Sequence, residues 1–381
     1  MDKRVSYVFA RRFVCAALGG ALLVRETLEE DTLDKVGIGI LSHAHGHANV
    51  YCDVMCGFDD VELVATWDDN LERGKKAAQS YGLEYRADAE DVIADPAIDA
   101  LIVTCETNRH AEFVERAAAA GKHVLLQKPM ATTMADCDRI IEAVNRSGIK
   151  FGMAFQMRHD PVNIKIKELV DARTVGNIAV IRRRHCISVL LNPSFFNGPT
   201  RWHVDPVANV GMFFDDATHA ADWFYWIFGA PRSVIAEIDN VVTNVAPDDN
   251  GVAIFRFPGG EMGILFNSST TVAAVATTEI YGDQGTIVQD YGDGPACAAP
   301  RPDGAVPLRS IRRGEKAWTE YNLPIPNSQR DRLAAIPRPF IDYVRGLTDE
   351  TISAEEGRVS VEMVLGAYRS MAEGRRVEFP L

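Results

Sequence analysis

The sequence predicts an α/β protein with a doubly wound parallel sheet over residues 35–155 and an α+β part with a large, mostly antiparallel open sheet over residues 156–381. Two observations support this division. From Lys35 to about Phe155, short apolar runs alternate with segments of helix length, whereas after Phe155 strand-like runs follow one another directly. The chain has 381 residues, of which 47% are hydrophobic, and this length allows two packed domains rather than one.

The first part contains apolar runs rich in β-branched residues, which are typical of buried parallel strands. We expect strands at Val36–Leu41, Val61–Thr66, Asp99–Thr104, His123–Leu126 and Lys150–Phe155. Four helices are expected between these strands. The first ends at Cys56, and the others span Leu71–Tyr81, Ala111–Ala120 and Met134–Ser147. This alternation predicts a Rossmann sheet, whose parallel strands are joined by right-handed crossovers.

The second part is expected to be mainly antiparallel, because turn signals such as Pro258-Gly259-Gly260 separate its strands. A helix near Asn163–Ala172 precedes strands at Ile178–Ile181, Ser233–Ala236, Gly251–Phe257, Glu261–Phe266 and Thr278–Tyr281. A strong helix over Asp215–Phe228 is embedded among these strands, and helices near Pro337–Gly346 and Ala354–Glu373 close the chain. Residues 300–304 are expected to form a surface loop.

Residues 1–34 form an extension with two interpretations. Arg11 and Arg12 precede an apolar stretch, Phe13–Val24, which has the length of a signal peptide and is too short to span a bilayer. A twin-arginine export signal would fit this pattern, but no small-x-small cleavage site follows it. The other interpretation is an appended or mis-started N-terminus. We expect a cytoplasmic protein with no transmembrane segment.

The charge balance argues against nucleic acid as the main partner. The chain carries 53 Asp and Glu against 40 Lys and Arg, a formal net charge of -13, and such a surface repels phosphate backbones. We interpret the densest basic cluster, Arg182-Arg183-Arg184, as a solvated strand end. The seven Cys are odd in number and irregularly spaced, which indicates reduced, mostly buried thiols.

The loop after the first strand is the expected phosphate site of a dinucleotide cofactor. It runs from Gly39 to His47 and lacks a clean G-x-G-x-x-G pattern. The following helix could still bind phosphate through its N-terminus, with Ser42 and His43 as added donors. His43, His45 and His47 occur at every second residue and raise the alternative of a metal site. No carboxylate or cysteine lies in the loop, and we expect no metal.

Asp68 stands at the end of the second strand. A carboxylate there can accept both ribose hydroxyls of the adenosine and repels a 2′-phosphate. We therefore expect NAD rather than NADP as the cofactor.

Two later segments carry the expected chemistry. Lys128 follows a parallel strand and precedes Pro129, at the edge where such sheets place ligands, and its ammonium could stabilise a substrate alkoxide. Asp215 and His219 are four residues apart, so they project from one helix face, and the carboxylate would raise the proton affinity of the imidazole and orient it as a general base. The purely structural alternatives are a solvent-facing Lys128, an Asp215 N-cap and a core His219.

These segments resemble the glucose–fructose oxidoreductase / inositol dehydrogenase / MocA family from about Lys35 to the C-terminus. Residues 119–129 are similar to the family's A-G-K-H-V-x-x-E-K-P. The resemblance also rests on Asn108–His110, Arg158–Pro161, Trp202–Pro206, the Asp215-x-x-x-His219 helix and Tyr281–Gly285. Three departures stand out: Gln127 replaces Glu, Ile40 and Ser42 occupy glycine positions of the phosphate loop, and Asp216 stands where an apolar residue is usual. The loop change puts cofactor affinity and the choice between NAD and NADP in question.

The resemblance implies roles for individual residues. Lys128 would be shared by cofactor and substrate, Asp215 and His219 would form the substrate-side pair with His219 as proton acceptor, and Arg158 and Trp202 would line the substrate pocket. The expected cofactor-binding residues are Ile40, Ser42, His43, Asp68, Glu106, Asn108, His110, Gln127, Lys128 and Pro129, with His110 near the nicotinamide. The family also implies a homo-dimer or homo-tetramer formed through the exposed face of the C-terminal sheet.

The expected activity is hydride transfer between a nicotinamide and a secondary alcohol or ketone of a sugar, a sugar derivative or an inositol-like cyclic polyol. His219 would remove the hydroxyl proton while Lys128 stabilises the oxyanion. Two alternatives stay open. One is a dinucleotide-binding sensor or regulatory protein without catalysis, and the other is an NAD-using glycosidase that oxidises a sugar hydroxyl transiently and releases aglycone without net NADH.

Overall fold

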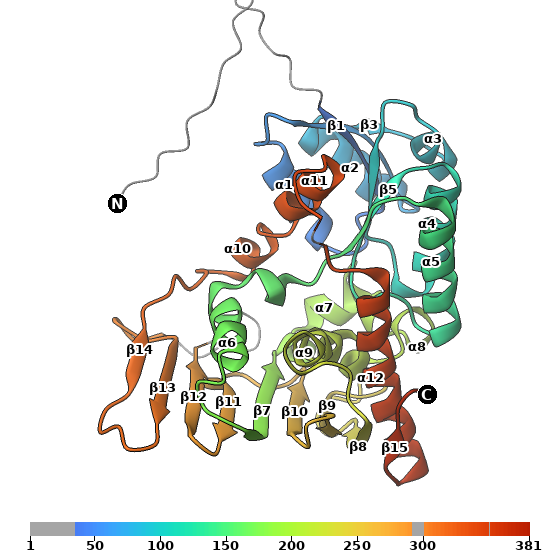
Figure 1. Cartoon of the computed structure of the whole chain (residues 1–381). Helices are drawn as coiled ribbons and strands as arrows, with labels where there is room; N and C mark the ends of the chain where they lie inside the picture. Colours follow the sequence, from blue (N-terminus) through green and yellow to red (C-terminus); the bar gives the residue numbers. More distant parts are fainter. Residues whose placement is uncertain (1–34, 292–300, 350) are drawn as a thin grey trace, which may run out of the picture. The chain divides into compact units, whose positions relative to one another are not determined.

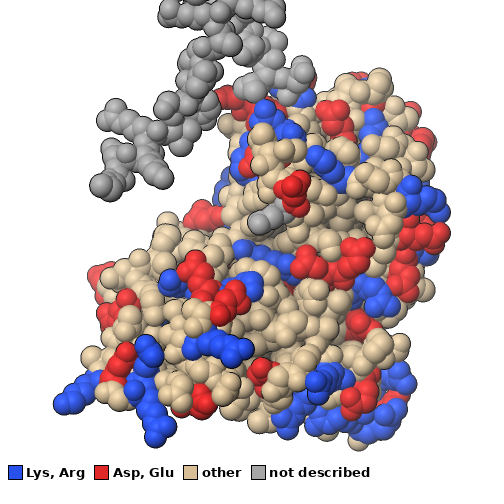
Figure 2. All heavy atoms as spheres, viewed as in Figure 1, with Lys and Arg blue, Asp and Glu red and all other residues tan. Residues whose placement is uncertain are grey.

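The computed structural model describes residues 35–291, 301–349 and 351–381. The expected N-terminal extension, with Arg11, Arg12 and the stretch Phe13–Val24, lies outside these residues, as do Cys15, Cys297 and the first residue of the expected loop at 300–304. On the face seen in Figure 2, acidic and basic side chains lie among one another rather than in two separate regions.

A six-stranded parallel sheet forms the N-terminal part, in the order β3-β2-β1-β4-β5-β6. Figure 1 labels β1, β3 and β5 of this sheet. Its strands are β1 (Val36–Leu41), β2 (Val61–Trp67), β3 (Glu84–Tyr85), β4 (Ala100–Val103), β5 (His123–Leu126) and β6 (Phe151–Met153). The connecting helices are α1 (His47–Met55), α2 (Leu71–Tyr81), α3 (Ala89–Ile93), η1 (Thr107–Arg109), α4 (His110–Ala119) and α5 (Met134–Ser147). The predicted Rossmann sheet is confirmed. Because the strand order reverses between β1 and β4, ligands are expected outside the carboxyl ends of these strands.

A nine-stranded mixed sheet follows, in the order β14-β13-β12-β11-β7-β10-β9-β8-β15. Its strands are β7 (Ile178–Cys186), β8 (Ser233–Asp239), β9 (Asn250–Arg256), β10 (Met262–Ser268), β11 (Ala276–Gly282), β12 (Gly285–Asp290), β13 (Leu308–Arg312), β14 (Thr319–Tyr321) and β15 (Val377–Glu378). Neighbouring strands are antiparallel except β7 and β10, which are parallel. The predicted large, mostly antiparallel open sheet is confirmed, and the expected turn at residues 258–260 joins β9 to β10.

Helices α9 and α12 pack on this second sheet, α9 against β7 and β10 and α12 against β8 (Figure 1). The helices of this part are η2 (Gln156–His159), α6 (Pro161–Asp171), η3 (Val189–Leu191), α7 (Pro193–Asn197), η4 (Arg201–Val204), α8 (Pro206–Asn209), α9 (Met212–Phe228), α10 (Gln329–Leu333), α11 (Pro337–Val344) and α12 (Ala354–Glu373). A capping box formed by Ser353 and Glu356 starts α12 at the expected residue. Over the residues that the structure describes, no helix is long and apolar enough to cross a membrane.

The end of the chain returns to the first sheet. Helices α10 and α11 contact α1, and Leu333, Phe340 and Ile341 share a buried apolar cluster with Ile38 of β1. These helices lie beyond the expected division at residue 155, yet their apolar faces complete the core beside the Rossmann sheet. Burial of this kind depends on a distant segment, which a local pattern does not reveal.

The prediction for Arg182-Arg183-Arg184 was wrong for its central residue. The three residues lie inside β7, where successive side chains point to opposite faces of the sheet. Arg183 is fully buried, its guanidinium lies 4.2 Å from the centroid of the Trp223 ring, and it donates to Thr278 Oγ1 at 2.8 Å. The aromatic ring and the hydroxyl replace part of the water that the cation loses.

Candidate active site

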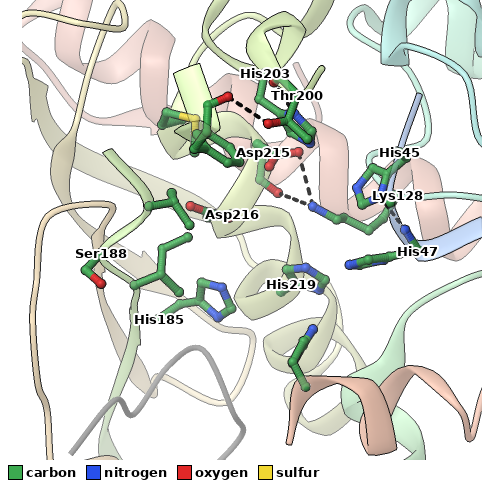
Figure 3. Close-up of a pocket in the computed structure, with 16 residues that line it drawn as sticks. His45, His47, Lys128, His185, Ser188, Thr200, His203, Asp215, Asp216 and His219 are labelled. Carbon is green, nitrogen blue, oxygen red and sulfur yellow. Dashed lines mark hydrogen bonds and ion pairs between the residues drawn. The ribbon is translucent and has the colours of Figure 1, made fainter. Parts of the chain in front are cut away.

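A cavity of about 450 Å³ lies where residues after β1 and β5 face the end of β7 and the start of α9 (Figure 3). The residues lining it are His45, Gly46, His47, Lys128, His185, Ile187, Ser188, Val189, Phe195, Thr200, His203, Met212, Asp215, Asp216, His219 and Gln329. The cavity is therefore at the ligand-binding edge of the Rossmann sheet. The second part of the chain supplies most of its wall.

Buried polar contacts hold the first turn of α9 in place. The N–H groups of Phe213 and Phe214, which find no acceptor within the first turn of the helix, donate to Asp248 Oδ1 at 2.5 Å and to the Tyr368 hydroxyl at 3.0 Å. That hydroxyl donates in turn to Asp248 Oδ2 at 2.6 Å. These bonds fix the part of α9 that presents Asp215 to the cavity.

Lys128 and Asp215 form a buried ion pair across this cavity. The Lys128 Nζ lies 3.1 Å from Asp215 Oδ1, and the two side chains are 4% and 5% exposed. Burial by itself would raise the pKa of Asp215, but the Lys128 ammonium and then His203 outweigh it, so the pKa lies below its ordinary value. Lys128, Asp215 and His219, which the sequence singled out, all line the same cavity (Figure 3).

His219 is not oriented by Asp215, contrary to the sequence prediction. The Asp215 carboxylate faces Lys128, and the His219 ring stacks on His185 with centroids 5.2 Å apart. Burial lowers the pKa of His219 well below its ordinary value, and the charge of Lys128 lowers it further, whereas a paired carboxylate would have raised it. His219 is a neutral imidazole, and its Nδ1 is buried without a hydrogen-bond partner among the described residues.

Asp216 is a cavity residue that the sequence analysis did not assign to the site. It is buried and accepts a hydrogen bond from Ser269 Oγ at 3.0 Å. Burial, followed by the negative charge of Asp215, raises the pKa of Asp216 to about 8. The carboxyl group is therefore mostly protonated at neutral pH and can donate a hydrogen bond. The one signal in the sequence was an acidic residue where the family resemblance favours an apolar one.

The substitution Asp216→Asn should stabilise the protein increasingly as the pH rises. The folded-state pKa of about 8 exceeds the ordinary value of 3.8, so between these values the folded protein keeps a proton that the unfolded chain releases. Wild-type stability therefore falls from about pH 4 to about pH 8, whereas an amide does not titrate. Thermal unfolding at about pH 5 and about pH 9 should show the larger gain in Tm at the higher pH. Equal gains at both would contradict the raised pKa.

Five imidazoles surround the ion pair: His45, His47, His185, His203 and His219. Burial is the largest cause of the shift in each; it lowers the pKa of His47 and of His185 to about 3 and that of the other three below the ordinary value. The rings are thus neutral at physiological pH, and each offers one N–H donor and one acceptor nitrogen. Across residues 35–291, 301–349 and 351–381, no group of three or more His, Cys, Asp or Glu is arranged to hold a metal ion.

The backbone amides of the loop after β1 donate hydrogen bonds to acceptors within the protein. The N–H groups of Ser42, His43, Ala44 and His45 donate to Trp67 O, Asp68 Oδ2, Ser42 Oγ and Thr104 O at distances between 2.7 and 3.1 Å. Ser42 has a φ of 75°, which is the left-handed region that favours glycine. The loop therefore keeps the conformation of a glycine turn without offering these amides to a phosphate.

The cofactor contacts expected of Ile40, Ser42 and His43 stay predictions, and the structure shows where these side chains lie. Ile40 lies within β1 and is fully buried in the core. The Ser42 hydroxyl accepts the Ala44 N–H, and the His43 ring lies between Asn49 Oδ1 and Thr66 Oγ1, each at 3.1 Å. The polar groups of Ser42 and His43 thus have hydrogen-bond partners within the protein. The sequence did not reveal these partners, because they lie in other segments of the chain.

Other predicted cofactor residues lie around the same edge. The Asp68 carboxylate is at the end of β2 and accepts from Arg73 Nε at 2.8 Å and from the Asn70 N–H at 2.7 Å. Glu106 precedes η1 and pairs with Arg109 at 3.4 Å, and Asn108 is exposed within η1.

His110 is buried beside the segment that carries Lys128. Its Nδ1 lies 2.9 Å from Pro129 O, and its Nε2 lies 3.2 Å from Cys105 O. Burial lowers the pKa of His110 to about 4, against the opposing effect of these carbonyl groups. His110 therefore positions the loop after β5 rather than lining the cavity.

Two predicted contact points of a dinucleotide, Lys128 and Asp68, lie at the expected places, and the Asp68 carboxylate is fully buried and hydrogen-bonded to His43, Asn70 and Arg73. Lys128 reaches the cavity after β5, and Asp68 lies where an adenosine ribose is bound in sheets of this topology. At the start of α1, Gly46 faces open space, because a Cβ added there would meet nothing within 4 Å. The amides of residues 42–45 are the part of the expected site that does not fit.

Arg158 and Trp202, which were expected to line the substrate pocket, lie outside its wall. Arg158 forms a buried ion pair with Asp222 at 2.6 Å. Trp202 packs beside the loop after β1 and donates from Nε1 to Ala44 O at 3.2 Å, while its ring stacks on His203. His203, rather than Trp202, reaches the cavity.

Two family models match the chain. One, described as "Oxidoreductase family, NAD-binding Rossmann fold", matches residues 36–155, and the other, described as "GFO/IDH/MocA C-terminal domain", matches residues 163–288. Together they cover most of the chain.

Individual relatives are more distant. The chain is 27% identical to the myo-inositol 2-dehydrogenase of Thermotoga maritima over 84% of this chain and 92% of that protein. It is 25% identical to the 1,5-anhydro-D-fructose reductase of Ensifer adhaerens over 83% and 91%, respectively. The crystal structure of GenD2 from gentamicin A biosynthesis, in complex with NAD, superimposes with a TM-score of 0.76 at 21% identity and covers 95% of this chain and all of that one.

Proposed function

The chain belongs to the Gfo/Idh/MocA oxidoreductase family, and from that premise we propose that it transfers hydride between NAD and a secondary alcohol or ketone of a neutral sugar or cyclic polyol. The acting groups are Lys128, Asp215 and His219. One observation carries the proposal: the Lys128 ammonium, 3.1 Å from Asp215, shares its cavity with the neutral imidazole of His219.

The cofactor supplies the hydride acceptor or donor when it is bound. Lys128 would hold its nicotinamide end, and Asp68 would hold the adenosine ribose. The choice of NAD over NADP rests on Asp68, because a buried carboxylate at the end of β2 repels a 2′-phosphate. Arg73 neutralises part of that charge.

The residues of the cavity divide the proton chemistry among them. Lys128 donates a hydrogen bond to the substrate oxygen and stabilises the negative charge that develops there. Asp215 orients the ammonium through their ion pair of 3.1 Å. His219 is unprotonated and accepts the hydroxyl proton during oxidation or returns it during reduction.

The wall of the cavity supports a neutral substrate. Lys128 and Asp215 compensate each other, Asp216 is mostly protonated, and the imidazoles are uncharged. Among the described residues that line the cavity, no unpaired cation is therefore left to bind a carboxylate or phosphate. Neutral imidazoles match hydroxyl groups, which also donate and accept. The apolar side chains of Ile187, Val189, Phe195 and Met212 can cover the C–H face of a ring.

Asp216 favours one second candidate, an NAD-using glycosidase. A protonated carboxyl group inside the cavity could protonate a departing glycosidic oxygen after transient oxidation of the sugar. This reaction releases aglycone without net NADH. A sensor without catalysis, the third interpretation of the sequence, has no comparable support in the site.

Assays with the full-length chain test these proposals together. The panel contains myo-inositol, scyllo-inositol, free aldoses and methyl and nitrophenyl glycosides, each with NAD or NADP, and NADH absorbance is followed alongside product release. NAD-dependent oxidation of a polyol or sugar, with NADP the poorer cofactor, is expected. Aglycone release without net NADH would favour the glycosidase, and cofactor binding without turnover of any compound would contradict both enzymes.

We also propose that the chain forms a homo-oligomer through the open face of the nine-stranded sheet. On the face away from α9 and α12, Ile235, Val252 and Tyr281 are exposed. A charge on this face, as in Val252→Asp on β9, is expected to shift the mass from an oligomer to a monomer in light scattering. Val241→Asp, at an exposed position beyond β8, is the matched control. A monomeric wild type would contradict the proposal.

A further inference from the structure

Gln127 connects Lys128 to the first loop through a buried hydrogen-bond chain. Its Oε1 accepts from the Lys128 backbone N–H at 2.8 Å. Its Nε2 lies 2.9 Å from His47 Nδ1 and 3.2 Å from the Tyr51 hydroxyl. Gln127 and Tyr51 are buried, so water does not compete for these contacts.

The hydrogen bond from the Lys128 N–H to Gln127 Oε1 fixes the donor and acceptor in each of the other hydrogen bonds that Gln127 makes. A backbone N–H can only donate, so the Gln127 atom facing Lys128 must be the carbonyl oxygen. The amide nitrogen therefore points at His47 and can only donate. It follows that His47 Nδ1 is the acceptor and that the single proton of this neutral ring lies on Nε2.

The Nε2–H of His47 is directed at the cavity. His47 lines the cavity beside Lys128 and His219 (Figure 3), and within the described residues its Nε2 has no hydrogen-bond partner. The titratable groups that act on the ring are Lys128, Asp215 and His203. His45 is in edge contact, with centroids 4.1 Å apart, and Tyr51 lies behind the ring, with centroids 6.3 Å apart.

We propose that His47 is a fixed hydrogen-bond donor to an oxygen of the bound polyol or sugar, and that Gln127 sets the tautomer that makes it one. This deepens the proposed function, because it adds a second donor beside Lys128 at the same cavity. A glutamate at position 127 would instead accept a hydrogen bond from a protonated Nδ1. The same ring would then present either an acceptor nitrogen or a charged imidazolium to the substrate.

Histidine nitrogen NMR tests the tautomer without requiring turnover. In protein labelled with ¹⁵N-histidine, the His47 signal is identified as the one missing from His47→Gln. The expected pattern is an unprotonated Nδ1 and a protonated Nε2 that do not titrate between about pH 5 and about pH 9. A protonated Nδ1, or an imidazolium in this range, would overturn the inference.

Two substitutions at position 127 separate its role from simple packing. Gln127→Glu is expected to protonate His47 Nδ1, whereas Gln127→Met should leave a mixture of both tautomers. If the wild-type pattern persists in both variants, Gln127 does not set the tautomer. Thermal unfolding of each variant shows whether it is folded before its spectrum is interpreted.

Ligand titration then tests the donor role. Saturating myo-inositol or methyl β-D-glucopyranoside should shift the His47 Nε2–H signal, and failure of both to do so would overturn the role. For the better substrate, His47→Leu should raise KM about 10-fold and change kcat less than about 3-fold, which is the size expected for one neutral hydrogen bond. His47→Gln, which keeps an N–H donor, should stay within about 3-fold of the wild type.

His123→Gln is the matched control. His123 begins β5, at the opposite end of the strand from Lys128, and its Nδ1 accepts the Lys150 N–H at 3.2 Å. Its substitution should leave KM and the His47 signal unchanged. A protein that shows the predicted tautomer and ligand shift but no NADH formation would retain this inference and lose the proposed dehydrogenase activity.

Discussion

We expect Lys128→Met to lower turnover of the best polyol or sugar substrate by about 10²- to 10⁴-fold, the range for loss of a preorganised charge that stabilises an oxyanion. Methionine fills a similar volume but cannot donate a hydrogen bond. The ammonium lies 3.1 Å from Asp215 in a buried site, where little water could take over its role. Steady-state rates and single-turnover rates at saturating substrate measure the effect.

The control must separate chemistry from stability. Removing one partner of a buried pair leaves the other charge uncompensated and typically costs about 3–5 kcal/mol. The double variant Lys128→Met/Asp215→Asn relieves that charge and should recover most of the Tm but none of the turnover. Lys122→Met is the matched control, because Lys122 does not line the cavity and its Nζ donates to the carbonyl groups of Asp95 and Ile98. Turnover near wild type in Lys128→Met would remove Lys128 from the mechanism.

His219→Gln is the second substitution with a large expected effect, again about 10²- to 10⁴-fold in turnover. Glutamine keeps a polar side chain but has no basic nitrogen. The buried ring is neutral in the wild type, because burial and then Lys128 lower its pKa well below the ordinary value. The base is thus already unprotonated at neutral pH.

The pH profile adds a second readout for His219. A base must be unprotonated to act, so wild-type kcat/KM should be flat through neutral pH and fall only as the pH drops through this lowered pKa. The variant should lose that acidic limb as well as rate. An acidic limb centred near the ordinary histidine value of 6.5, or a variant with unchanged kcat, would contradict the assignment.

Most elements of the fold could be predicted from local patterns. The bounds of β1, α2, β5, α5 and α12 agree with the sequence prediction, because apolar periodicity and caps are set by residues a few positions apart. The short β3 and α3 and the later strands β12–β15 were not predicted. Most of these strands are short or lie near a sheet edge, where few residues carry a pattern.

The candidate site was predicted in part. The sequence identified Lys128, Asp215 and His219, and the structure brings all three to one cavity. The sequence analysis paired Asp215 with His219, whereas the structure pairs Asp215 with Lys128. Spacing on a helix shows which side chains share a face but not what lies opposite that face. Lys128 and Asp215 are 87 positions apart in the chain, so a pattern of neighbouring residues cannot show that they meet.

The sequence by itself determined the two sheets, the family, and the residue types able to stabilise an oxyanion and accept a proton. The tertiary structure decided which atoms meet: Lys128 with Asp215, Gln127 with His47, and the loop amides with internal acceptors. It also decided charge, since burial makes the cavity imidazoles neutral and keeps Asp216 largely protonated. The physical reason is that helices and strands follow from neighbours in the chain, whereas proton affinity and tautomer follow from water exclusion and partners that only packing brings together.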